Sequence, residues 1–184
     1  MDKTRASNRI EEDIARAPSS PSVWKDLLYL LAKIGAIALV FMILFTFVFG
    51  IVRYTEPSMS PAIKDGDLVI FYRGDEGAYH ARDAVVLEVG RQKQVRRVVA
   101  IAGDSVDITE EGLVINGALQ QEPGIYQKTE RFTEGVDFPL IVPDGHVFVL
   151  GDSRAESLDS RIYGSVEVGD IQGSVMTVIR RRDI

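Results

Sequence analysis

One long apolar segment limits what this chain can fold into more than any other feature of its sequence. Residues 34–52 read IGAIALVFMILFTFVFGIV and contain no charged side chain. At about 1.5 Å of rise per residue, a helix of this length approaches the roughly 30 Å hydrocarbon thickness of a bilayer. The segment is apolar on every face, and no later segment has the pattern of a helix that could bury it. We therefore predict one N-terminal transmembrane anchor helix over residues 24–53.

The residues that flank this segment predict an uncleaved anchor and its orientation. The apolar run is longer than that of a signal peptide, and the following RYTEPSM has no small-x-small cleavage site. Cationic side chains are more frequent before the segment (Lys3, Arg5, Arg9, Arg16, Lys25 and Lys33) than in the stretch after it (Arg53, Lys64 and Arg73). Positive charge near a span stays on the cytoplasmic side. We expect a single-pass protein of the cell membrane, with a cytoplasmic tail over residues 1–23 and an extracytoplasmic domain over residues 54–184.

The sequence after the anchor has the period of β-strands. Short β-branched runs are separated by Gly, Asp, Asn and Pro, at residues 68–72, 84–89, 95–101, 105–108, 113–115, 147–150 and 175–179. Asn116-Gly117 is typical of a type I′ hairpin turn. No helical period of useful length follows the anchor. The sequence therefore predicts one mainly β domain, without repeats.

Composition excludes several classes of function. The chain has no cysteine, which excludes a disulfide framework, thiolate catalysis and a cysteine-ligated metal. The formal net charge of −6 argues against nucleic acid as a partner.

Three motifs in the β-rich part carry a resemblance. They are SMSPAIKDGDLVI after the anchor, VRRVVAIAGDSV in the middle, and GDSRAESLDSRIYG over residues 151–164. They resemble, in order, the three boxes of the type I signal peptidases, the S26 family of serine peptidases. Those boxes are Ser-Met-x-Pro followed by Gly-Asp-x-Val, then Lys-Arg-Val-Val followed by Pro-Gly-Asp, and last Gly-Asp-Asn-Arg-x-x-Ser-x-Asp-Ser-Arg-x-x-Gly. Together they span most of the chain from residue 56 onward.

The resemblance implies both a fold and a function. It implies an antiparallel β-sheet domain behind a single anchor, and a membrane-bound serine endopeptidase with Ser58 as nucleophile. Its substrates would be exported preproteins, whose N-terminal signal peptides are cleaved while they lie extended against a strand edge. The lipid bilayer is its other partner, and neither a metal nor an organic cofactor is implied.

The position of the general base departs from the family. Signal peptidases use a buried lysine there, and this chain has Arg96. Arginine is effectively never deprotonated in proteins, so it can assist a serine but is a poor proton acceptor. Strand alternation directs Lys93 to the opposite face, and Lys64 lies in the turn after the serine motif, so neither replaces the missing lysine.

A histidine base is not predicted either. The only histidines are His80 and His146, which we expect to have structural or surface roles. A Ser–His–Asp triad is therefore not expected.

The last motif supplies supporting residues by the same resemblance. Ser157 would hydrogen-bond and orient the base, and Asp159 with Arg161 would form an acid–base pair that supports the site. Arg97 matches a structural arginine of the family, which we expect to pair with Asp152.

Glu56 is a second departure. The position two residues before the nucleophile normally helps to form the oxyanion hole. A carboxylate beside a developing oxyanion is repulsive unless it points away.

These departures leave an alternative function open. Signal-peptidase-like proteins associated with Gram-positive pilus assembly depart from the catalytic dyad, and Arg96 and Glu56 resemble that group. Such a homologue would present or fold pilin or other surface-protein precursors without cleaving them. Loss of maturation in Ser58→Ala distinguishes the peptidase from this assembly factor.

Overall fold

The computed structural model describes residues 23–74 and 77–180 and divides the chain into two compact units, with the boundary after Ile43. The predicted cytoplasmic tail, residues 1–23, lies outside the described residues except for Val23.

The first unit contains one apolar helix, α2 (Val23–Ile43), none of whose residues is buried. Asp26 lies in its first turn, where a negative charge favours a helix N-terminus. With the π-helical turn η1 (Leu44–Val48), α2 gives a stretch of 26 residues with a mean hydropathy of 2.5. By length and composition this stretch can cross a membrane, since a span needs about 20 apolar residues.

The helix ends earlier than the sequence predicts. Phe49–Arg53 form a strand, β1, which pairs antiparallel with β2 (Leu68–Tyr72). This segment contains two β-branched residues, which favour a strand. A Cβ at Gly50 would come within 2.1 Å of the Phe71 ring, so the glycine allows the two strands to pack. The end of the apolar run therefore belongs to the sheet and not to the helix predicted over residues 24–53.

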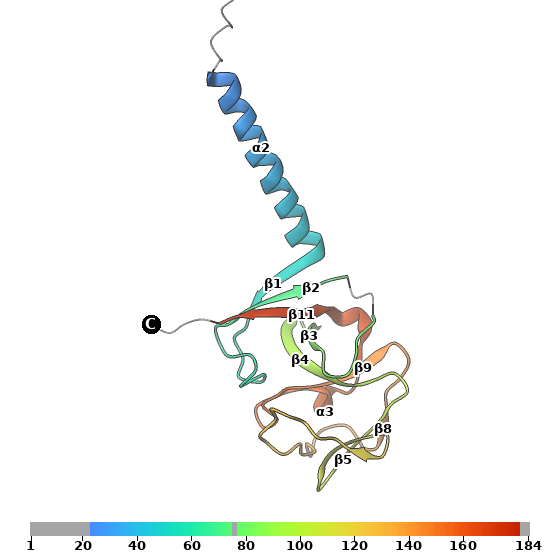
Figure 1. The fold of residues 1–184 in the computed structure, drawn as a ribbon. Coiled ribbons are helices and arrows are strands. Elements are labelled where there is room, and N and C mark those ends of the chain that lie inside the picture. Colours follow the sequence, from blue (N-terminus) through green and yellow to red (C-terminus); the bar gives the residue numbers. More distant parts are fainter. Residues whose placement is uncertain (1–22, 75–76, 181–184) are drawn as a thin grey trace, which may run out of the picture. The chain divides into compact units, whose positions relative to one another are not determined.

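The second unit is built from two antiparallel sheets (Figure 1). The larger has the order β1-β2-β11-β3-β4-β9-β10 and adds β3 (Ala84–Val89), β4 (Gln92–Ile101), β9 (His146–Leu150), β10 (Val166–Glu167) and β11 (Ile171–Ile179). The smaller has the order β7-β6-β5-β8 and contains β5 (Ser105–Thr109), β6 (Gly112–Ile115), β7 (Ala118–Leu119) and β8 (Leu140–Ile141). The predicted mainly β, antiparallel class is confirmed.

Each predicted strand run lies inside an observed strand, namely β2, β3, β4, β5, β6, β9 or β11. Asn116 and Gly117 have φ values of 52° and 80°, as a type I′ turn requires, and join β6 to β7. The sequence missed β1, the two-residue strands β7, β8 and β10, the 3₁₀ turn η2 (Val168–Asp170) and the short helix α3 (Ser160–Tyr163). Elements of two to four residues are too short to show a period.

One of the three core clusters anchors the segment between β1 and β2. Met59 and Ile63, both from this segment, are 0% and 3% exposed and pack with core residues of the larger sheet, including Phe71 and Val95. Burial of one such side chain stabilises the fold by about 1.5–3 kcal/mol. The segment between β1 and β2 is therefore packed against the larger sheet at two positions, Met59 and Ile63.

Candidate functional site

Ser58 lies in a tight turn between β1 and β2, inside the segment that Met59 and Ile63 anchor. The Ser60 backbone N–H donates to the Pro57 carbonyl at 2.9 Å, and the Ile63 N–H donates to the Met59 carbonyl at 2.9 Å. Ser58 is 2% exposed. Its hydroxyl is thus held by a rigid turn and shielded from bulk solvent.

The Ser58 Oγ has three polar partners. The Tyr54 hydroxyl lies 2.7 Å away, and the Arg96 Nη1 donates to Oγ at 2.7 Å. The Ser58 Oγ donates to the Glu56 Oε2 at 3.1 Å. A serine hydroxyl has one hydrogen to donate and two lone pairs. These three contacts therefore use its whole hydrogen-bonding capacity.

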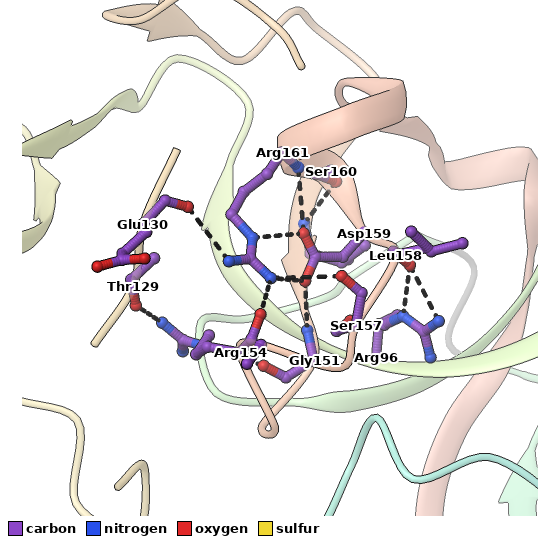
Figure 2. Close-up of polar contacts among 12 residues, drawn as sticks. Arg96, Thr129, Glu130, Gly151, Arg154, Ser157, Leu158, Asp159, Ser160 and Arg161 are labelled. Atoms are coloured by element: carbon purple, nitrogen blue, oxygen red, sulfur yellow. Dashed lines mark hydrogen bonds and ion pairs between the residues drawn. The ribbon is translucent and has the colours of Figure 1, made fainter. Parts of the chain in front are cut away.

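Arg96 reaches Ser58 from strand β4, where it pairs across the strand with Val85. It is 2% exposed, and its Nε and Nη2 donate to the Leu158 carbonyl at 3.1 and 3.0 Å (Figure 2). Its Nη1 also donates to the Glu56 Oε2 at 3.1 Å and to its neighbouring carbonyl, that of Val95, at 2.7 Å. A guanidinium is a donor only. Arg96 therefore fixes the serine and the carboxylate without being able to take a proton from either.

Two tyrosines beside these charges stay neutral. Burial raises the pKa of the Tyr54 hydroxyl, and the hydrogen bond with Ser58 opposes this shift. Burial likewise raises the pKa of Tyr163, against the positive charge of Arg96. Because the ordinary tyrosine pKa is already near 10, both phenols keep their protons at neutral pH.

The loop that follows β9 closes on the serine turn. The Ser153 backbone N–H donates to the Ser58 carbonyl at 2.9 Å. A Cβ at Gly151 would lie 2.6 Å from the Ser58 carbonyl oxygen and 2.2 Å from the Ser157 Oγ. Only glycine therefore allows this loop to approach Ser58 so closely.

A buried ion pair holds the same loop (Figure 2). Asp159 binds the Arg161 Nε and Nη2, both at 2.9 Å, and the two side chains are 0% and 2% exposed. Asp159 also accepts from the Gly151 backbone N–H at 3.0 Å and, as the N-cap of α3, from the Arg161 backbone N–H at 3.2 Å. The pairing expected from the sequence is present, and it connects the glycine beside Ser58 to the start of α3.

Arg154 extends this network and was not singled out from the sequence. It is 1% exposed and binds Glu122 through two nitrogens, at 2.5 and 2.8 Å. It also donates to the Gly151 carbonyl at 2.9 Å and to the Thr129 hydroxyl, while its own carbonyl accepts from Arg161 at 2.5 Å. Arg154 is the arginine of the GDSR motif, and this position in the sequence could have identified it as part of the site.

The expected pair of Arg97 and Asp152 is also present. The Arg97 Nε and Nη2 donate to the two carboxylate oxygens at 2.8 and 2.6 Å, a bidentate arrangement. The bond to Asp152 raises the pKa of Arg97. This pair connects β4 to the residues after β9 next to the site.

Ser157 behaves differently from the expectation. Within the part of the chain that the structure describes, its buried Oγ has no hydrogen-bond partner. The donors of Arg96 are directed to Ser58, Glu56 and backbone carbonyls, so none reaches Ser157. The Ser157 carbonyl accepts from Arg161 at 3.4 Å instead (Figure 2).

The alternative bases weighed in the sequence lie elsewhere. Lys93 is exposed on β4 opposite Glu88, and Lys64 is exposed in the segment before β2. The His80 Nδ1 lies 3.7 Å from Asp83, and the His146 Nδ1 lies 3.0 Å from the Asp144 carbonyl. Neither Glu56 nor Tyr54 was assigned to Ser58 from the sequence, although both lie within four residues of it.

Among the residues that the structure describes, no group of three or more His, Cys, Asp or Glu side chains is arranged to hold a metal ion. The polar groups gathered at Ser58 are a hydroxyl, a phenol, a guanidinium and a carboxylate. Such a set can perform nucleophilic acyl transfer, provided that one member accepts the proton of the serine.

Comparison with known proteins bears on this arrangement. Residues 27–179 match the family described as signal peptidase, peptidase S26. The chain is 32% identical over 142 residues to signal peptidase I of Bacillus caldolyticus, covering 70% of this chain and 78% of that protein. It is 33% identical over 168 residues to signal peptidase IB of Staphylococcus aureus strain Mu50, covering 79% and 87%. A crystal structure of a signal peptidase I from Enterococcus faecalis V583 aligns with a TM-score of 0.44 at 28% identity, covering 54% of this chain and 97% of that one.

Proposed function

The chain belongs to the S26 family of signal peptidases, and on that premise we propose that Ser58 is the nucleophile with which it cleaves signal peptides. Family membership makes it a membrane-anchored serine endopeptidase that acts on exported preproteins carrying N-terminal signal peptides. One observation supports the choice of Ser58. The serine turn, strand β4 and the loop after β9 meet at Ser58, with the Arg96 Nη1 2.7 Å from the Ser58 Oγ and the Ser153 backbone N–H donating to the Ser58 carbonyl at 2.9 Å.

The supporting residues have distinct roles in this proposal. Arg96 holds the Ser58 hydroxyl and places a permanent positive charge beside it, which favours the developing negative charge of the attacking oxygen. Asp159 and Arg161 fix the loop that carries Gly151, and Arg97 with Asp152 ties that loop to β4. Ser157 fills the space beside Gly151.

The membrane orientation is part of the same proposal. Lysine and arginine are more frequent before the apolar helix than after it, so the N-terminus faces the cytoplasm and the β domain lies outside. The domain organisation proposed is a tail over residues 1–23, an anchor that begins at residue 24, and an extracytoplasmic domain. In this orientation Ser58 follows the anchor closely in sequence, as a peptidase for membrane-inserted substrates requires.

Pilin and other surface-protein precursors are included among the proposed substrates because they are exported preproteins. The non-catalytic assembly factor is not favoured, since the relatives at 32% and 33% identity are signal peptidases.

A cleavage assay tests this function. The full-length protein in detergent is incubated with a leader peptide that has small residues one and three positions before the cut. We expect cleavage by the wild type and none by Ser58→Ala, while Ser105→Ala in the smaller sheet retains activity. If wild type and Ser58→Ala are equally inert while Arg96→Lys gains activity, the chain is not a peptidase in its natural form.

A further inference from the structure

The serine of a peptidase must lose its proton as it attacks, and the partners of Ser58 determine where that proton can go. The Ser58 Oγ contacts the Tyr54 hydroxyl, the Arg96 Nη1 and the Glu56 Oε2. Arg96 has no acceptor atom. Tyr54 is a protonated phenol because burial raises its pKa. Of the three, only the carboxylate of Glu56 can accept the proton.

The hydrogen-bond directions agree with this conclusion. Arg96 occupies one lone pair of the Ser58 Oγ as a donor. Tyr54 occupies the other when it donates its phenolic hydrogen at 2.7 Å. The single hydrogen of Ser58 is then directed to Glu56 at 3.1 Å, which is within the 2.6–3.2 Å reach that a general base needs.

The position of Glu56 also suits a group that exchanges protons with a substrate. Its side chain is 32% exposed, whereas Ser58 and Arg96 are each 2% exposed. The carboxylate therefore contacts the serine on one side and faces solvent on the other. A proton taken from Ser58 can therefore leave Glu56 on its solvent-facing side.

Arg96 orients the carboxylate. Its Nη1 lies 3.1 Å from the Glu56 Oε2 and 2.7 Å from the Ser58 Oγ, so one nitrogen holds both reacting groups. The Arg96 Nε and Nη2 both donate to the Leu158 carbonyl, and these two bonds fix the position of the guanidinium. Arg96 is thus a positioning and charge-stabilising residue that stays protonated throughout.

We propose that Glu56 is the general base that activates Ser58, in place of the lysine that this chain lacks. This proposal rests on the proposed function. Glu56 takes the Ser58 proton as Oγ bonds to the scissile carbonyl carbon and the π electrons move to the carbonyl oxygen. The carbonyl re-forms as the C–N bond breaks, and Glu56 gives the proton to the leaving nitrogen. Water then attacks the acyl ester, losing a proton to Glu56, and the Ser58 oxygen leaves and recovers that proton.

The test compares carboxylate variants in the full-length protein in detergent. Glu56→Gln keeps the shape and an acceptor oxygen for Arg96 but is not basic, so we expect kcat to fall by at least about 100-fold with KM changed by less than about threefold. Glu56→Asp keeps a carboxylate and should retain a kcat between those of the wild type and Glu56→Gln. Glu110→Gln, in an exposed turn of the smaller sheet, is the matched control and should retain wild-type kcat.

The pH profile provides a readout that a structural ion pair would not move. The ionisable groups that face Glu56 are Arg96 from β4, Tyr54 directly after β1, and Tyr163 from α3. Burial raises the pKa of both phenols, so neither loses its proton toward acid pH, and a guanidinium has no acceptor atom. Because a protonated carboxyl group cannot take the proton of Ser58, kcat/KM of the wild type should fall toward acid pH. The residual activity of Glu56→Gln should lack this limb.

Labelling with a fluorophosphonate separates failure of this proposal from failure of the proposed function. If the wild type cleaves, Ser58→Ala does not, and Glu56→Gln keeps more than a tenth of kcat, Glu56 is not the base and the peptidase assignment stands. If the wild type does not cleave but Ser58 is labelled at a rate that Glu56→Gln lowers, the base assignment stands and the substrate class is wrong. If the wild type neither cleaves nor is labelled, both are overturned.

Discussion

Two of the buried arginines of the second unit, Arg161 and Arg96, each pair with a carboxylate, but their surroundings differ. Arg161 and Asp159 are 2% and 0% exposed, and Asp159 also accepts two backbone N–H groups. Arg96 is equally buried, but its partner Glu56 is 32% exposed and contacts a serine hydroxyl.

The difference shows how an arginine–carboxylate pair can serve two purposes. A carboxylate surrounded by fixed donors is held as an anion, and its loss leaves a buried charge without a partner. A carboxylate with one side open to solvent can gain and lose a proton without unfolding its surroundings. The Asp159 pair supports the loop after β9, and the Glu56 pair is suited to exchange protons with a substrate.

The largest expected effect is a difference in the free energy of unfolding between variants of the two pairs. Asp159→Asn should lower the free energy of unfolding by about 3–5 kcal/mol, because Arg161 then stays buried without a negative partner. Glu56→Gln should change it by less than about 1 kcal/mol, since the amide oxygen still accepts from Arg96 at a partly exposed position. Guanidinium unfolding of both variants in detergent, followed by near-ultraviolet circular dichroism, measures the difference. Equal losses would mean that Glu56 is as structural as Asp159.

Gly151 connects the two regions, and its substitution should affect both. In Gly151→Ala the new Cβ would lie 2.2 Å from the Ser157 Oγ and 2.6 Å from the Ser58 carbonyl oxygen. We expect a loss of about 1–3 kcal/mol in stability, as for other overpacked sites, together with loss of cleavage because the serine turn must move.

A second substitution sharpens the test of Gly151. Adding Ser157→Gly removes one of the two contacts but leaves the backbone of Ser58 in place. The double variant should therefore not recover cleavage. Full recovery would mean that the loop, and not the serine turn, absorbs the new side chain.

The sequence predicts the second unit well where a residue type alone determines the structure. β-branched runs between turn residues identify β2, β3 and β9, and Asn116-Gly117 identifies a hairpin because both positions need positive φ. The apolar run predicts a helix but not its end, because β1 forms only when β2 is present to pair with it. Strand pairing across the chain is not visible in a local pattern.

In the site too, the sequence predicts the residues that take part but not the contacts between them. The three motifs bring Ser58, Arg96 and Asp159 into one region of the fold, but the partner of each side chain depends on its direction in space. From the sequence, the Glu56 carboxylate is expected to repel an oxyanion unless it points away. In the structure it contacts the Ser58 Oγ and the Arg96 Nη1. The direction follows from a turn that Met59 anchors, which no local sequence pattern specifies.

Alkaline pH provides a further comparison of the site with its support. Burial raises the pKa of Tyr163 and Tyr54 in the folded protein above the ordinary value near 10. Above pH 10 the unfolded chain loses these protons while the folded chain keeps them, so stability must fall as pH rises. The slope is about 1.4 kcal/mol per pH unit for each such group.

Tyr163→Phe tests how much of this loss of stability at alkaline pH comes from Tyr163. Unfolding between pH 9 and 11 should show a shallower decline in the variant than in the wild type. Tyr126→Phe, at a position that is 85% exposed, is the matched control and should leave the slope unchanged. Identical slopes in all three proteins would show that Tyr163 titrates at an ordinary value.

The smallest expected effect concerns Ser157, which lies between the two regions. Its Oγ is buried and has no hydrogen-bond partner among the described residues, so Ser157→Ala removes no bond and leaves no donor unsatisfied. Stability should change by less than about 1 kcal/mol and in the stabilising direction, because an unpaired buried hydroxyl costs free energy. Ser160→Ala is the contrasting control, because the Ser160 Oγ accepts from the Val149 backbone N–H at 3.0 Å and its loss should destabilise by about 1–3 kcal/mol. A loss as large in Ser157→Ala as in Ser160→Ala would mean that Ser157 has a polar partner in solution, and would place it in the reacting cluster beside Glu56 instead of in its support.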